Sequence, residues 1–353
     1  MKDCYINGLG SISAQRTYEG DFLEHVSVND VANVIYADQP SYKEVIPPAA
    51  IRRMAKGVKM GIYTSNQALK EAMVEIPDAI ITGTGMGCVE DSDKFLKAII
   101  DNNEQFLTPT SFIQSTHNTV GAQIALGLQC KGYNFTYVNG AVSFESALLD
   151  AKLQLEYEEV NSILVGGIDE TSQHIIDLYK MVNIIKRDED KPFSILNSKS
   201  NGVVLSEGAS FFVIETEPKQ SSYAVVKDIS IYNELTPNEV SVFIIKFLAK
   251  NNLNTEDIDV LVLGKNGDFI FDNYYEKAES AFNKASKVYY KHLSGEYSTV
   301  SAFGLWVAAK ILKTQKIPQA IKMNTINKEK YDYVLLYNQY RGKDHSLILL
   351  KKC

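Results

Sequence analysis

Cysteine and histidine are the side chains that would supply a nucleophile or metal ligands, and this sequence spreads them thinly. The four cysteines, Cys4, Cys88, Cys130 and Cys353, show no C-x-x-C spacing, and the five histidines do not cluster with them along the chain. Metal sites and disulfide frameworks depend on such spacing. We therefore expect no metal and no disulfide, and interpret each cysteine as a small buried or terminal residue.

A glycine-rich turn, TGTGMG at Thr82–Gly87, is the other local pattern with a chemical meaning. Phosphate-binding loops and plain turns both use glycine because it tolerates unusual backbone angles. A dinucleotide site would need a third glycine at the Rossmann spacing and an acidic residue after a second strand, and both are missing. We expect no cofactor at this turn.

Composition and charge narrow the class of protein. Hydrophobic residues make up 45% and charged residues 22% of the 353 residues, which is typical of a globular protein. A net charge of −7 argues against nucleic-acid binding. The longest apolar stretches are far shorter than the roughly 20 residues of a membrane span, and Met1–Gly10 lacks the features of a signal peptide. These observations favour a cytoplasmic protein.

Short apolar runs alternate with amphipathic stretches, which is typical of an α/β protein with strands buried on both faces. Strands are expected at Asp78–Gly83, Ser162–Gly167 and Asp259–Gly264. Apolar residues at helical spacing predict helices over Lys56–Val74 and Ser143–Glu158.

The second half of the chain repeats the order of the first. Four pairs of segments are similar and follow one another in the same order: DAIITGTGMG and DVLVLGKNGD, AVSFESALLDAKLQL and TVSAFGLWVAAKILK, SILVGG and DYVLLY, ASFFVIE and HSLILLKK. The polar stretch Glu215–Ser222 separates the two sets. We predict a duplication, with residues 1–220 as the first half and 221–353 as the second.

Taken in order, the motifs resemble those of the β-ketoacyl-acyl carrier protein synthases, or ketosynthases. The matching segments are YINGLG at Tyr5–Gly10, TGTGMG, VGGIDE at Val165–Glu170, and KPFS at Lys191–Ser194 followed by NGVVLSEGASFFVIE at Asn201–Glu215. The resemblance covers nearly the whole chain. It implies a thiolase-like α/β fold, in which two similar βαβαβ halves form a five-layered α-β-α-β-α sandwich.

A ketosynthase uses a cysteine thiolate at a helix start and two histidines that stabilise an enolate. In this sequence the strand predicted at Asn134–Val138 leads into NGAVSFESALLDA, and the position corresponding to the nucleophile is Ala141. An alanine methyl cannot form a thioester. Ser143, two residues on, is an alternative nucleophile, although serine at a helix start ordinarily caps or packs the helix.

The two family histidines correspond to Asn266 in GKNGD and Glu296 in KHLSGE, while Lys291 matches the family lysine. An ionised Glu about 4 Å from a forming enolate would repel it by roughly 4 kcal/mol at an effective dielectric of 20. Neighbouring His292 is interpreted as structural. By the same resemblance, Tyr340 is the expected pocket gate, and the residues around Phe144 are expected to help bound the acyl tunnel of a partner synthase.

These substitutions predict a catalytically degenerate subunit, similar to the chain-length factors that pair with an active ketosynthase in type II polyketide and aryl-polyene pathways. The strand NFTYV would then bind the partner across a two-fold interface. A β-ketoacyl synthase-family acyltransferase acting through Ser143, or a malonyl decarboxylase, is the alternative. A third possibility is a homodimer that binds acyl carrier protein without turnover.

Overall fold

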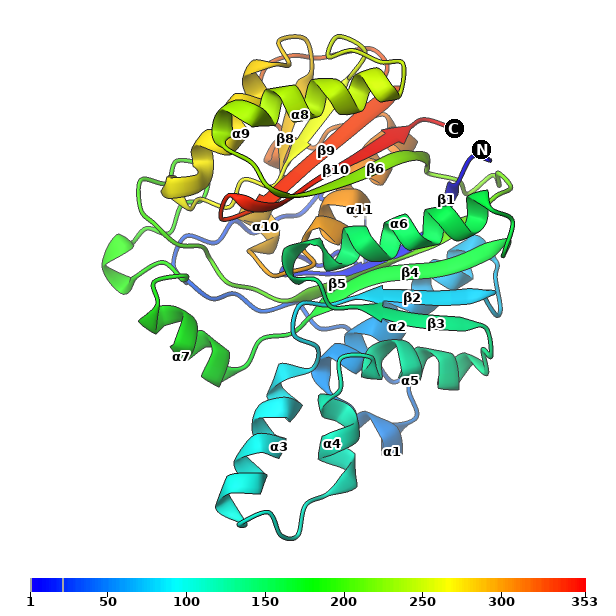
Figure 1. Cartoon of the computed structure of the whole chain (residues 1–353), viewed down its shortest axis with the longest axis vertical. Helices are drawn as coiled ribbons and strands as arrows, with labels where there is room; N and C mark the ends of the chain where they lie inside the picture. The colour runs from blue at the N-terminus through cyan, green and yellow to red at the C-terminus, as the bar shows by residue number, and fades with distance from the viewer. Residues whose placement is uncertain (1, 21) are drawn as a thin grey trace.

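The computed structural model describes residues 2–20 and 22–353, and in this part of the chain ten strands form one mixed sheet (Figure 1). The strands are β1 (Tyr5–Ile12), β2 (Ala79–Gly83), β3 (Tyr133–Tyr137), β4 (Ser162–Asp169), β5 (Gly208–Glu215), β6 (Ala224–Glu234), β7 (Val260–Leu263), β8 (Ser286–Tyr289), β9 (Tyr333–Tyr340) and β10 (Lys343–Lys351). The predicted strands correspond to β2, β3, β4 and β7 within one or two residues. The motif segment Tyr5–Gly10 lies in β1, and Met1 lies outside the described residues.

The strand order is β3-β2-β4-β5-β1-β6-β10-β9-β7-β8, so the same arrangement occurs twice. In each half the second strand pairs in parallel with the third and fourth, while the fifth runs antiparallel between the fourth and the first. The halves meet where β1 pairs with β6 at Tyr5–Val225 and Ile6–Ala224. The predicted duplication of the fold is therefore confirmed, while a domain boundary at residue 220 stays a proposal.

The described residues form eleven α-helices, and those that pack on the sheet lie in three layers around the two half-sheets (Figure 1). They are α1 (Pro48–Ile51), α2 (Lys56–Ala72), α3 (Val89–Asp101), α4 (Pro109–Ser115), α5 (Thr119–Leu128), α6 (Ser143–Glu156), α7 (Gln173–Met181), α8 (Pro237–Lys250), α9 (Asp272–Ser280), α10 (Lys291–Ser294) and α11 (Ser301–Thr314). Short 3₁₀ turns occupy η1 (Gly140–Val142), η2 (Asp188–Asp190), η3 (Phe269–Phe271) and η4 (Gln319–Ile321). None of the helices in the described residues could cross a membrane.

The middle layer consists of α6 and α11, which share one apolar core with both half-sheets. Eleven residues of α11 are buried, because a helix enclosed between two sheets must be apolar on nearly all sides. The α2–α5 pair covers the outer face of the first half, and α8 with α9 covers that of the second. This arrangement is the five-layered sandwich expected from the sequence.

Close packing fixes the start of α6 against β2. A Cβ on Gly83 would lie 2.5 Å from the backbone oxygen of Ser143, so only glycine allows this approach. The same helix start follows β3 through η1, where Gly140 has a φ of +54°. The backbone therefore turns from strand to helix within a few residues, and the head of α6 lies at the carboxyl ends of β2 and β3.

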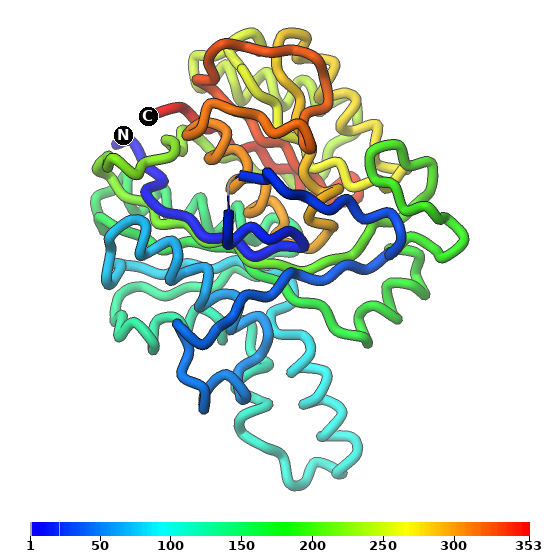
Figure 2. The backbone as a smooth tube through the Cα atoms, turned by 180° about the vertical axis from the view of Figure 1, so that it is seen from behind, coloured from blue at the N-terminus to red at the C-terminus, as the bar shows by residue number. Residues whose placement is uncertain are grey.

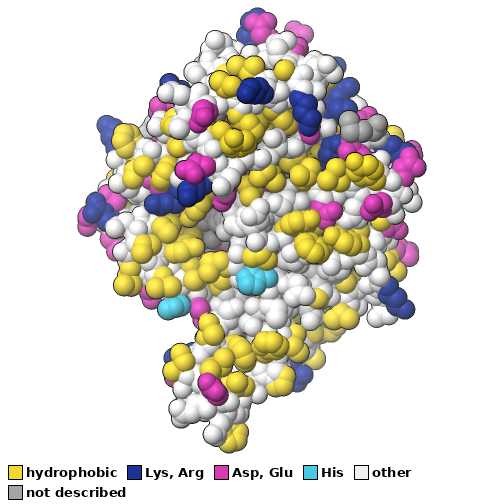
Figure 3. Space-filling view, in the orientation of Figure 1, with side chains coloured by type: hydrophobic (Ala, Val, Ile, Leu, Met, Phe, Trp, Pro, Cys, Tyr) yellow, Lys and Arg dark blue, Asp and Glu magenta, His cyan; other side chains and the backbone are white. Residues whose placement is uncertain are grey.

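Two segments leave the layers. Helices α3 and α4 form an arm that projects from the body, and each buries a single residue, Val89 or Gln114 (Figures 1 and 3). Seen from behind in Figure 2, the chain between residues 22 and 47 crosses the molecule without a helix or a long strand. It contacts the 184–206 segment through a Val34–Leu205 bridge and a hydrogen bond from Phe193 to Asp30.

Candidate functional site

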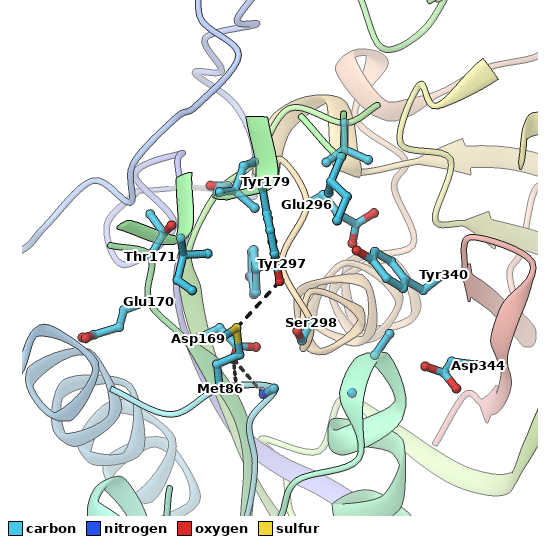
Figure 4. A pocket seen from close by; sticks show the side chains of 18 residues that line it. Met86, Asp169, Glu170, Thr171, Tyr179, Glu296, Tyr297, Ser298, Tyr340 and Asp344 are labelled. Atoms are coloured by element: carbon cyan, nitrogen blue, oxygen red, sulfur yellow. Dashed lines mark hydrogen bonds between the residues drawn. The ribbon is translucent and has the colours of Figure 1, made fainter. Parts of the chain in front are cut away.

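A cavity of about 240 Å³ lies between the ends of β2 and β4, the head of α6, the turn after α10, and the β9–β10 hairpin (Figure 4). Its wall includes Met86, Ala141, Asp169, Glu296 and Tyr340. Ligand pockets typically measure roughly 300–1,000 Å³. This cavity is therefore small for an acyl chain with its carrier.

Ala141 lines the cavity from the head of α6, together with Gly140. It sits in the η1 turn directly before the helix and is 6% exposed. The amino end of a helix lowers the pKa of a thiol placed there and stabilises an oxyanion. Here that position offers a methyl group and a backbone amide, so the helix dipole has no nucleophile to activate at residue 141.

Ser143 does not line the cavity. Its hydroxyl donates to the carbonyl oxygen of Gly140 at 2.7 Å and accepts the backbone N–H of Asn139 at 2.8 Å. The side chain is fully buried. Because its single proton is committed to a backbone carbonyl, Ser143 closes the strand-to-helix turn, and this geometry gives it a structural role.

Three predicted site residues do meet. The Glu296 carboxylate accepts the Asn266 amide Nδ2 at 2.6 Å and lies 2.8 and 3.0 Å from Nζ of Lys291. Exposed side-chain fractions are 1% for Lys291 and 6% for Glu296. The chain thus forms a closed, hydrogen-bonded ion pair beside the cavity, with the amide of Asn266 as a third member.

The ion pair changes the electrostatics expected from the sequence. An isolated Glu296 would place a full negative charge near a forming enolate, whereas the Lys291 ammonium at 2.8 Å compensates that charge. Both donor groups of the trio also bind Glu296: Nδ2 of Asn266 donates to one carboxylate oxygen, and Nζ of Lys291 lies against both. Repulsion is therefore weaker than expected, and both donor groups are directed at the carboxylate.

Tyr340 lines the cavity, and its ring lies on the same side as Glu296 (Figure 4), while its role as a gate stays a prediction. Burial, and then the nearby Glu296, raise the pKa of Tyr340, so its hydroxyl stays protonated. Phe144 is elsewhere: it is fully buried in the core with its ring 5.8 Å from that of Phe212. His292 also lies off the cavity, with Nε2 bound to the Ala320 carbonyl oxygen at 2.8 Å.

Two acidic residues at the end of β4 organise the cavity wall. The Asp169 carboxylate accepts Thr84 and the Gly85 amide on one side and Thr299 on the other, at 2.8–3.0 Å. Glu170 accepts the backbone N–H groups of Gly57 at 2.5 Å and Glu90 at 3.1 Å. Asp169 thereby ties the two halves of the chain together, and the VGGIDE motif marks its position in the sequence.

Sequence reasoning missed Asp344, which lines the cavity from the β9–β10 hairpin. A Cβ built on Gly140, the residue before Ala141, would lie 3.3 Å from the Oδ2 atom of Asp344. No local pattern singles out this aspartate, because its role depends on a contact between distant segments. Within the described residues, no group of three or more His, Cys, Asp and Glu side chains is placed to hold a metal ion.

The profile of the family described as "Beta-ketoacyl synthase, N-terminal domain" matches residues 25–220, more than half of the chain. No curated protein matches the chain in sequence. Solved structures with the same fold include a beta-ketoacyl synthase from Burkholderia phymatum STM815, with a TM-score of 0.78, 15% identity and 100% coverage of both chains.

Two further structures of this fold contain a ketosynthase and a chain length factor. The ishigamide ketosynthase/chain length factor has a TM-score of 0.79 and 15% identity, covering 100% of this chain and 99% of its own. The ketosynthase with its chain length factor from Xenorhabdus doucetiae has a TM-score of 0.75 and 15% identity, covering 100% and 98%. These similarities establish the common fold.

Proposed function

Because the chain belongs to the beta-ketoacyl synthase family, we propose that it is a catalytically degenerate subunit of the chain-length-factor type. It pairs with an active β-ketoacyl synthase in the cytoplasm and takes part in the elongation of fatty-acid, polyketide or aryl-polyene chains carried on acyl carrier protein. In this role the fold and the pairing surface are retained, and the chemistry is left to the partner.

The main support for this proposal is that the residue at the head of α6 is an alanine. Ala141 faces the cavity at the amino end of a buried helix, where a thiolate would be most reactive. A methyl group cannot attack a thioester. The neighbouring hydroxyl of Ser143 is held by two backbone hydrogen bonds, which disfavours its use as a replacement nucleophile.

The polar groups next to Ala141 support the same conclusion. Decarboxylative condensation needs donors aimed at the place where negative charge develops. Nζ of Lys291 and Nδ2 of Asn266 instead each bind the carboxylate of Glu296. A malonyl decarboxylase, which would dispense with the nucleophile but not with these donors, is therefore disfavoured as well.

The exposed edge of the sheet offers a surface for pairing. Within the described residues β3 hydrogen-bonds to β2 alone, so its other edge is free. Tyr133, Phe135 and Val138 on and after this strand are 43–49% exposed, and the rings of Tyr133 and Phe135 stack at 6.0 Å. An unpaired apolar edge strand is a template for adding a strand from another chain.

Co-expression with an intact Cys-His-His synthase encoded beside it tests the proposal. We expect a stable heterodimer on size exclusion with light scattering, and Phe135→Glu should abolish it while leaving the melting temperature of the lone chain unchanged. Leu178→Glu, at a similarly exposed apolar residue on α7, is the matched control and should leave the heterodimer intact.

A chain that stays monomeric with and without that synthase would contradict the pairing role, and a complex of two identical chains would favour the homodimer. Incubation with acyl- and malonyl-loaded acyl carrier protein, followed by intact mass analysis, tests the loss of catalysis. A covalent acyl adduct that disappears in Ser143→Ala would refute it.

A further inference from the structure

Asp344 occupies an unusual backbone position in the hairpin that closes the cavity. Arg341 and Gly342 form the two-residue turn between β9 and β10, with φ values of 53° and 75°. Pairing of the two strands then shifts between Lys343 and Ser346. Asp344 lies in this bulge with a φ of 50°, a left-handed conformation that aspartate tolerates better than most residues.

A bulge of this kind redirects a side chain that would otherwise follow the alternation of the strand. Here it brings the carboxylate of Asp344 to the head of α6. A Cβ added to Gly140 would lie 3.3 Å from its Oδ2 atom, and Asp344 lines the cavity together with Ala141. The carboxylate thus lies against the turn that carries the residue in the nucleophile position.

The surrounding hairpin holds Asp344 in place. The backbone N–H of Gly342 donates to Oε1 of Gln339 at 2.7 Å, and Nε2 of His345 lies 3.1 Å from the carbonyl oxygen of Gly342. Nδ1 of His345 lies 3.0 Å from the hydroxyl of Tyr337, and Ser346 donates to the buried Glu145 on α6 at 2.7 Å. These bonds anchor both sides of the bulge to the core.

We propose that the carboxylate of Asp344 fills the place at the head of α6 that a substrate oxyanion or thiolate would take. It thereby prevents acyl transfer in this cavity. This inference deepens the proposed function, because it adds a second obstacle that is independent of Ala141. Restoring a thiol alone would leave the helix dipole directed at a fixed negative charge.

The proposal predicts how an introduced thiol behaves. In Ala141→Cys, a carboxylate a few ångströms away disfavours the thiolate, and thiolate is the form that reacts. In the double variant Ala141→Cys with Asp344→Asn, the charge is removed and the helix amino end is free to stabilise the thiolate. We expect the thiol at position 141 to react with iodoacetamide about tenfold faster at pH 7 in the double variant, since partial exposure of Asp344 screens the full interaction.

Site-resolved peptide mass spectrometry measures alkylation of each cysteine over a pH series. Cys88, buried to 1% exposure, reports on unfolding, because it should stay unmodified while the fold is intact. Ala141→Cys with Asp101→Asn removes an exposed carboxylate on α3 instead, and should react like Ala141→Cys alone. The experiment needs no partner protein, so its result is separable from a failure of heterodimer formation.

Asp344→Gly provides a second double variant, because glycine adopts the positive φ at this position without strain. It should show the same acceleration if the Asn variant fails to fold. Equal alkylation rates and pH profiles in Ala141→Cys and in the double variant that keeps Cys88 protected would overturn the proposal. So would an acceleration of the same size caused by Asp101→Asn.

Discussion

Replacing Lys291 by methionine should destabilise the protein far more than replacing a lysine in an exposed ion pair. Lys291 is 1% exposed, and the Glu296 carboxylate at 2.8 Å is its ionic partner. Methionine keeps most of the side-chain volume but carries no charge. Glu296 would then be a buried carboxylate that has lost its cation and keeps the hydrogen bond from Asn266. Breaking a buried pair on one side costs about 3–5 kcal/mol.

A double-mutant cycle isolates the pair. Glu296→Gln alone leaves a buried ammonium and should also lower the free energy of unfolding, whereas Lys291→Met with Glu296→Gln removes both charges and should lie within about 2 kcal/mol of wild type. The coupling energy should therefore be at least about 2 kcal/mol. Urea unfolding followed by fluorescence and far-UV circular dichroism measures all four proteins.

The Lys284–Glu256 pair is the matched control. Its N–O distance is 2.9 Å, but the side chains are 64% and 67% exposed, so Lys284→Met should cost less than about 1 kcal/mol. If Lys291→Met costs no more than Lys284→Met, or if the two single changes at the buried pair simply add, the description of this cluster as a closed ion pair is wrong. Lys291 and Asn266 would then not be held by Glu296 as donor groups.

Two further predictions concern side chains around the cavity. Ser143→Ala should lower the free energy of unfolding, measured in urea, by about 1–3 kcal/mol, because the Asn139 amide and the Gly140 carbonyl lose their partner. Ser146→Ala, at a less buried hydroxyl on the same helix, should cost less. Equal losses in the two variants would contradict the turn-closing role of Ser143. Burial raises the pKa of Glu170 from 4.5 to about 7. The native state therefore holds this proton more tightly than the unfolded chain, and the resulting stability is present below about pH 4.5 and lost as pH rises through about 7. Glu170→Gln should remove up to about 3 kcal/mol of this pH dependence, and an unchanged slope relative to wild type, or the same change in the exposed control Glu276→Gln, would count against it.

Local patterns in the sequence determined the secondary structure and the duplicated order. The apolar runs at Asp78–Gly83, Ser162–Gly167 and Asp259–Gly264 are strands, and the helical spacing at Ser143–Glu158 is α6. These elements can be predicted because a strand buried on both faces gives a short apolar run, whereas a helix buried on one face gives apolar residues at helical spacing. Ala141 at a helix start could also be located, because a strand, a glycine and a helix follow one another within a few residues.

The contacts between the side chains around the cavity depend on the tertiary structure. The sequence names Lys291, Asn266 and Glu296 as site positions, but only the fold directs both donors at one carboxylate and turns a repelling charge into a paired one. Asp344 lay outside sequence reasoning altogether, since its contact with Gly140 joins two halves of the chain through a bulge in β10. Strand register and bulges are set by long-range pairing, and a single residue of shift reverses the direction of a side chain.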